Sequence, residues 1–140
     1  MSAEISHQII LKRTTGGHFA TITVEEENNL IFIDWNGFLS VELVKEGSEE
    51  LLKIFKSYQH IHKILVNNKN VSGPWSKAND WYANDWNPRA ITAGLKYMAI
   101  IESENIFTQL SLKGFQKVSG GYEAQRFLRE EQARNWLQSV

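Results

Sequence analysis

The sequence predicts a single α/β domain spanning residues 1–140, with a mostly parallel central sheet, antiparallel N-terminal edge hairpins and about four helices. Two observations predict this class. From residue 30 onward, short apolar runs alternate with amphipathic stretches, which is the order that a parallel sheet with helical crossovers requires. Before residue 30, β-type runs are separated only by turn residues, which favours hairpins. A chain of 140 residues suits one domain and needs no disulfide or metal to hold its core together.

The first part of the chain is predicted to form three strands and then a helix. Residues 5–13 are rich in isoleucine, residues 19–24 alternate in polarity, and residues 30–35 form a third run, with turns at Thr14–Gly17 and Glu26–Asn29. Ser40 suits the N-cap of a helix over about residues 40–59, because apolar residues then recur at three- and four-residue steps. Gly47 weakens that helix by roughly 1 kcal/mol relative to alanine.

The second part continues as alternating strands and helices. Residues 63–67 and 96–101 are apolar runs typical of buried strands, and a helix begins at Pro74 between them. Further on, residues 106–118 favour a helix, residues 122–127 a last strand, and residues 129–139 a final helix. Asn87-Pro88 either kinks the second helix or restarts it, with Asn87 as the cap.

Three of the five tryptophans lie in the stretch PWSKANDWYANDWNP, residues 74–88. On a helix, Trp75, Tyr82 and Trp86 share one face with Ala78 and are predicted to be core. Trp81 points about 120° away from Trp75. It lies along the flank with Asp85, where either another element covers it or it lines a groove.

Composition and motifs exclude several functions. The chain has no cysteine, so disulfides and thiol catalysis are excluded. A net charge of −1 without a basic cluster argues against nucleic acid as a partner. No apolar run is long enough for a membrane span or a signal peptide, which makes the cytoplasm the expected compartment. His60 and His62 lack a third ligand for a metal, and no cofactor motif is present.

The order of elements carries a family resemblance. A strand ends in Asn67-Asn68, a helix reads W-x5-W-x4-W-x-P-R-A, and A-G-L-K-Y-M-A-I-I follows it; W-x-G-F at residues 35–38 precedes the first helix. This pattern resembles the STAS-like or SpoIIAA-like families, in particular a group of small stand-alone bacterial proteins with that fold. The resemblance covers about residues 19–139 and implies a single STAS-like domain.

The resemblance implies a regulatory role, although the sequence departs from the family's phosphorylation motif. The best-understood members antagonise anti-sigma factors through a phosphorylatable serine at the start of the helix after a central strand. The matching region here is residues 67–76, where Ser72 and Ser76 lie near that position. The usual Asp-Ser pair is absent, and Asn68 stands where many relatives have an acid. Other STAS-like domains bind nucleotides, apolar ligands or flavin.

We therefore expect a non-catalytic binding or regulatory module of STAS-like type, with a protein partner in signalling. In open α/β sheets ligands gather at the carboxyl ends of strands. The candidate binding surface consists of Asn67, Asn68, Asn70, Ser72, Trp81 and Asp85. A phosphate at Ser72 would meet free helix amides if Ser72 began the second helix.

Three alternatives stay open. A carrier or sensor of a small apolar, lipid-like ligand would need a cavity between the second helix and the last two helices, whereas a solid core with an exposed loop favours a protein partner. An enzyme would use Asp80 or Asp85 with a histidine, although the two acids lie too far apart around the helix to converge. A homodimer or structural oligomer would show an extensive apolar interface.

Overall fold

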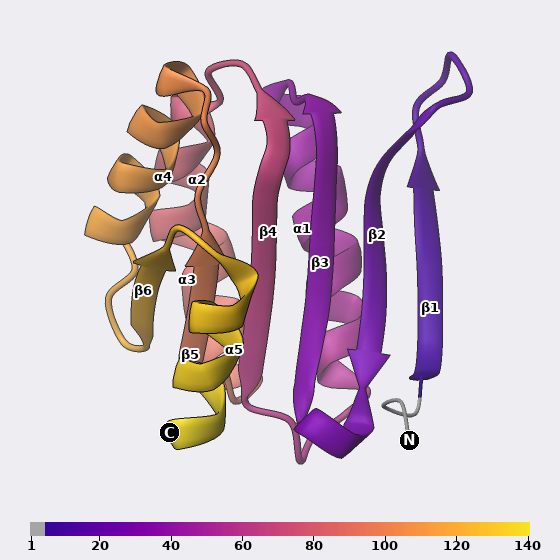
Figure 1. The fold of residues 1–140 in the computed structure, drawn as a ribbon, viewed down its shortest axis with the longest axis vertical. Helices are drawn as coiled ribbons and strands as arrows, with labels where there is room; N and C mark the ends of the chain where they lie inside the picture. The colour runs from indigo at the N-terminus through magenta and orange to yellow at the C-terminus, as the bar shows by residue number, and fades with distance from the viewer. Residues whose placement is uncertain (1–4) are drawn as a thin grey trace.

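The computed structural model describes residues 5–140 as a six-stranded sheet with helices on both faces (Figure 1). The strands are β1 (Ile5–Lys12), β2 (His18–Glu25), β3 (Leu30–Phe38), β4 (Lys63–Ser72), β5 (Tyr97–Ile101) and β6 (Glu123–Phe127). They lie in the sheet in sequence order; β1, β2 and β3 pair antiparallel, and β3 to β6 pair parallel. The predicted α/β class, with its antiparallel N-terminal edge, is confirmed.

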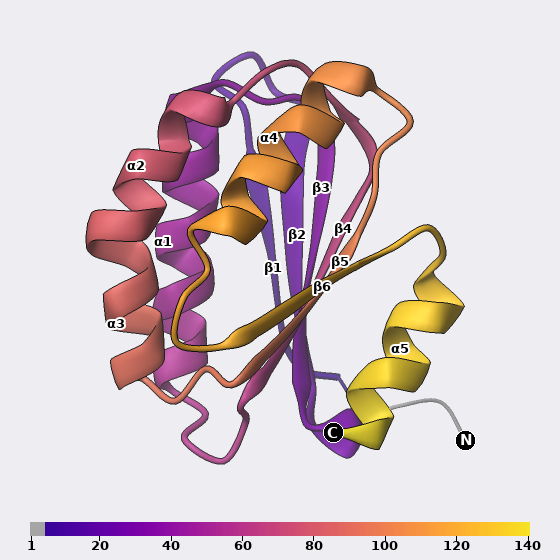
Figure 2. The ribbon, with the colours of Figure 1, turned by 90° about the vertical axis from the view of Figure 1, so that its left-hand side faces the viewer.

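Helices α1 (Val41–Lys56), α3 (Asn87–Thr92) and α4 (Ile106–Lys117) lie on one face with the short α2 (Asn79–Trp81), and α5 (Glu130–Ser139) lies alone on the other (Figure 2). The short helix η1 (Glu26–Asn28) forms the turn between β2 and β3. Ser40 caps α1 by accepting a hydrogen bond from the Leu43 amide, as predicted. Among residues 5–140, no helix is long and apolar enough to cross a membrane.

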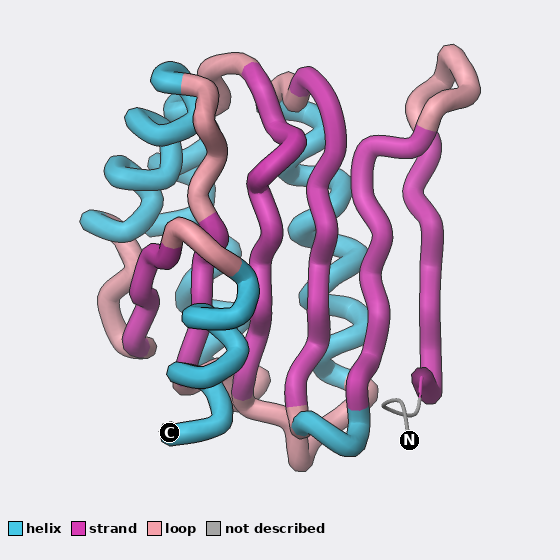
Figure 3. Tube along the Cα trace, in the orientation of Figure 1, coloured by secondary structure: helices cyan, strands magenta, loops and turns pink. Residues whose placement is uncertain are grey.

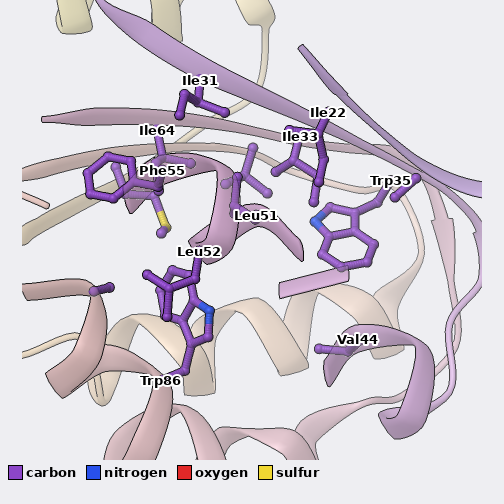
Figure 4. Packing of buried hydrophobic residues seen from close by; sticks show 14 of the residues in the cluster. Ile22, Ile31, Ile33, Trp35, Val44, Leu51, Leu52, Phe55, Ile64 and Trp86 are labelled. Carbon is purple, nitrogen blue, oxygen red and sulfur yellow. The ribbon is translucent and has the colours of Figure 1, made fainter. Parts of the chain in front are cut away.

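The main core fills the space between the sheet and the four-helix face. Trp86 contributes from the helical layer, Ile33 from the sheet, and Leu51 and Leu52 from α1 (Figure 4). Trp35, at the end of β3, lies against Gly47 of α1, where an added Cβ would collide with the indole ring. The glycine that weakens α1 as an isolated helix is therefore what lets that helix approach the tryptophan.

The second core is smaller and lies under α5. Ala133 and Leu137 pack there on Leu30, Leu65 and Ile101 of the sheet. Arg134 adds polar anchors: its guanidinium donates to both carboxylate oxygens of Glu25 at 2.8 and 2.9 Å. The same guanidinium lies 5.4 Å from the centre of the Phe32 ring, a cation–π contact.

Two boundaries of the second crossover differ from the prediction. Strand β4 continues to Ser72 rather than ending near residue 67, and the helical segment begins at Ser76 rather than Pro74. Because β3 extends to Phe38, its end pairs with β4 in parallel as far as Ser72. Ser72 is thus the last residue of a strand, so a phosphate there would not meet the free amides of a helix start.

Candidate functional site

The tryptophan-rich segment is one helical stretch with three pitches. It begins as the 3-10 turn η2 (Ser76–Ala78), passes through α2, widens into the π-helix η3 (Tyr82–Trp86) and ends as α3. In the π segment the Asn87 amide donates to the carbonyl of Tyr82, five residues back. Pro88 explains the widening, because its ring excludes the ordinary helical packing on the carbonyl four residues earlier. The chain neither breaks at Pro88 nor uses Asn87 as a cap.

The predicted buried face of this segment is confirmed. Tyr82 lies at the centre of an aromatic cluster, with ring centroids 6.4 Å from Trp75, 5.6 Å from Trp86 and 4.7 Å from Phe115. Its hydroxyl shares a hydrogen bond with Ser48, and burial raises its pKa well above the usual range. Trp86 donates its indole N–H to the Ser48 carbonyl at 2.7 Å. These rings hold the helical segment against α1, α4 and the sheet.

A cavity of about 40 Å³ remains inside this cluster, lined by residues that include Trp35, Asn68, Trp75 and Tyr82. Small-molecule sites commonly begin at about 300 Å³, so this space does not suit a lipid-like molecule. Its walls come from α1, the π segment and α4 together with the sheet, and not from α5.

Trp81 and Asp85 are neighbours on the flank but engage different groups. Trp81 is half-buried: its ring centroid lies 5.1 Å from that of Tyr82, and the Lys45 ammonium from α1 lies 5.7 Å from its ring. Asp85 is exposed and accepts a hydrogen bond from Arg89 at 2.9 Å, one helical turn on. A neighbouring helix therefore covers Trp81 in part, and Asp85 belongs to a surface ion pair.

The asparagines at the end of β4 lie on different sides of the sheet. Asn67 donates to the Asp34 carboxylate at 3.1 Å on the α5 face, where burial raises the pKa of Asp34 above its ordinary value of 3.8 although this hydrogen bond opposes the shift. Asn68 faces the main core, is 2% exposed and donates to the Ile101 carbonyl. Its place on the candidate binding surface was wrong, because strand alternation turns it inward. Asn70 is exposed and Ser72 is half-buried.

Loops follow β3, β4 and β5 at the carboxyl edge of the sheet (Figure 3). An apolar surface that the sequence alone did not predict is formed there. Four large apolar side chains are each more than half exposed: Phe38 at the end of β3, and Ile106, Phe107 and Leu110 in the first turns of α4. Pro74, in the loop after β4, is also exposed. We call these five residues the apolar ridge. Helical spacing in the sequence could have predicted this exposure. Thr108, Leu112 and Phe115 form the buried face of α4, so Ile106 and Leu110 lie on its outer face.

The apolar ridge is tied together by the loop after β4. The Phe38 ring packs on Gly73, at the site a Cβ would occupy. The Thr108 hydroxyl donates to the Gly73 carbonyl at 3.2 Å, and the Trp75 amide donates to the Ser111 hydroxyl at 3.0 Å. These contacts join β3, the loop and α4 into one fixed surface.

The histidines are engaged separately. The His60 ring nitrogen Nε2 lies 3.3 Å from the Glu26 carboxylate, whereas the His62 ring contacts the Gly94 carbonyl at 2.9 Å. Across the residues that the structure describes, no group of three or more potential ligands is arranged to hold a metal ion.

The comparison with solved structures identifies the architecture. The chain matches the crystal structure of an uncharacterized protein of the DUF3478 family with a SpoIIAA-like fold, from Shewanella loihica. The match has a TM-score of 0.52 and covers 98% of both chains at 16% sequence identity. This chain has a SpoIIAA-like fold. At that identity the SpoIIAA-like match establishes the fold alone. No protein-family model and no curated protein matches the sequence.

Proposed function

We propose that this SpoIIAA-like domain is a non-catalytic module that binds a protein partner through the apolar ridge at the carboxyl edge of its sheet. The observation that carries the proposal is that Phe38, at the end of β3, and Ile106, Phe107 and Leu110, in the first turns of α4, are all more than half exposed. Contiguous exposed apolar surface on a soluble domain is typical of interaction sites. Aromatic side chains at the centre of such a surface commonly carry most of the binding energy.

Two further observations support a protein partner over the alternatives. The cavity of about 40 Å³ is too small for a lipid-like ligand, so the core favours binding at the surface. Asp80 and Asp85 are both exposed, and Asp85 is paired with Arg89, which favours a solvated surface over an acid–base site for these two residues. Ser72 ends strand β4 and does not begin a helix, which weighs against a phosphoserine switch at that residue.

The test compares two exposed apolar residues by capture from the native host. Leu110→Asp places a charge in the ridge and should remove a specific partner that the wild type captures, lowering its recovery at least tenfold. Ile10→Asp, on the edge strand β1, makes the same chemical change away from the ridge and should keep the partner. Equal capture by both variants contradicts the proposal.

Sedimentation separates a foreign partner from self-association. If wild type is dimeric and Leu110→Asp is monomeric, the ridge joins two copies and the module is an oligomerisation domain instead. A monomeric wild type that still loses its partner on Leu110→Asp supports the proposal.

A further inference from the structure

A second site follows from the topology of the crossovers. After β4 and β5 the chain passes to the four-helix face, whereas after β6 it passes to the opposite face and forms α5 (Figure 2). Strands β5 and β6 are neighbours in the sheet. Their following loops therefore diverge, and in open α/β sheets this divergence at the carboxyl ends opens a crevice where ligands bind.

The structure has a crevice at this place. Its volume is about 410 Å³, and it is lined by the loop after β5, the loop after β6 and the end of β4. Small-molecule sites commonly begin at about 300 Å³, so an amino-acid-sized molecule fits. We call it the switch crevice and define it by Lys69, Glu102, Glu104, Leu128 and Arg129.

The switch crevice presents both signs of charge. Lys69 and Arg129 are exposed cations, and Glu104 is an exposed anion. Within residues 5–140 none of the three has an ion pair. An anionic ligand would leave Glu104 without a partner, and a cationic ligand would leave Lys69 and Arg129 without one. A zwitterion can pair with groups of both signs.

Glu102 adds an acceptor on the wall of the switch crevice. Its Oε2 accepts from Arg126 at 3.1 Å, but its Oε1 is buried and has no hydrogen-bond partner among the described residues. An unsatisfied buried acceptor is costly, and a glutamate's terminal torsion is soft. A ligand ammonium that donated to this oxygen after a rotation of the carboxylate would satisfy it. Leu128, 70% exposed at the rim, offers an apolar contact.

We propose that the switch crevice binds a free α-amino acid with an apolar side chain. Lys69 and Arg129 hold the carboxylate, Glu104 and Glu102 hold the ammonium, and Leu128 contacts the side chain. This site is distinct from the apolar ridge and does not depend on the proposed partner.

The test uses L-leucine, N-acetyl-L-leucine and L-leucinamide, followed through backbone amide signals in NMR titrations of the full chain. L-leucine should shift residues around 69, 102–104 and 128–132, and each derivative, which lacks one charge, should bind at least tenfold more weakly. No shifts with L-leucine, or equal affinity for all three compounds, overturns the proposal.

Variants assign the two ends of the ligand. Arg129→Gln should weaken L-leucine binding about tenfold. Its side chain makes no hydrogen bond or ion pair with residues 5–140, so the melting temperature should not change. Glu104→Gln should weaken L-leucine but not N-acetyl-L-leucine, because the latter has no ammonium. Lys113→Gln, an exposed charge on α4 outside the crevice, is the matched control and should bind as wild type does. Equal loss in all three variants contradicts the assignment.

Discussion

At Gly47 the absence of a side chain decides where a neighbouring tryptophan lies. The Trp35 indole occupies the space that a Cβ at Gly47 would need, and it is 5% exposed. Helix propensity alone predicts that alanine would improve α1 by about 1 kcal/mol. Packing outweighs this gain, because α1 would have to move away from the sheet or the indole would have to turn.

We expect Gly47→Ala to destabilise the domain by about 1–3 kcal/mol, the usual cost of overpacking a core. Urea denaturation measures it. Gly17→Ala is the control, because nothing lies within 4 Å of a Cβ built there, and it should change stability little. A Gly47→Ala variant as stable as wild type would show that α1 and Trp35 adjust freely.

The tryptophans of the helical segment differ in burial, and their removal should differ in cost. Trp75 and Trp86 are 5% and 1% exposed, whereas Trp81 is only half-buried. Trp75→Ala and Trp86→Ala should each cost about 3–5 kcal/mol, and Trp81→Ala clearly less. Chemical denaturation ranks the three, and a Trp81→Ala variant that is the least stable would contradict the buried-face assignment.

At the scale of single elements, α5 is the lone helix on its face of the sheet. It packs through Ala133 and Leu137 and is fixed by the pairing of Arg134 with Glu25. The hydrogen bonds from Arg134 lower the pKa of Glu25 below its ordinary value of 4.5, although burial opposes the shift. A lowered pKa means that the pair stabilises the fold above pH 4.5 and that this contribution disappears as the pH falls.

Glu25→Gln should therefore cost about 1–3 kcal/mol at neutral pH, the lower part of this range reflecting the partly exposed Arg134. The gap between variant and wild type should close as the pH falls below about 4.5. Urea denaturation at several pH values measures it. Glu131→Gln is the control: Glu131 is an exposed acid of α5 that forms no ion pair among the described residues, and its variant should show no such gap.

For the molecule as a whole, the order and type of elements could be predicted from the spacing of apolar residues. Short apolar runs indicate buried strands, and apolar residues at three- and four-residue steps indicate helices. The site could be predicted only in part. A strand that stops at residue 67 predicts Asn68 on the surface, but β4 continues to Ser72 and its alternation turns the Asn68 side chain inward with Val66. The π segment depends on how Pro88 is accommodated, and the apolar ridge depends on how α4 docks. Both depend on tertiary packing, which a local sequence pattern does not predict.

Two buried tyrosines should set the alkaline limit of the whole domain. Burial raises the pKa of Tyr82 and of Tyr122 above the ordinary value of 10.0. Their contribution is thus fully present below pH 10 and is lost above it, because the unfolded chain then releases protons that the folded chain retains. The free energy of unfolding should fall above about pH 10, and the fall should be shallower in Tyr122→Phe. An unchanged slope in that variant contradicts the assignment.

The sequential strand order has a consequence for how the chain acquires its structure during synthesis. Every strand pairs with the strand made just before it, so no strand waits for a distant partner, and the loop to be closed is never longer than one crossover. The first three strands can assemble as antiparallel hairpins as soon as they leave the ribosome. Each later strand then adds to the free edge, and α5 covers the second face last. The sheet grows in the direction in which the chain is translated, which shortens the time during which its apolar edge is open to other chains.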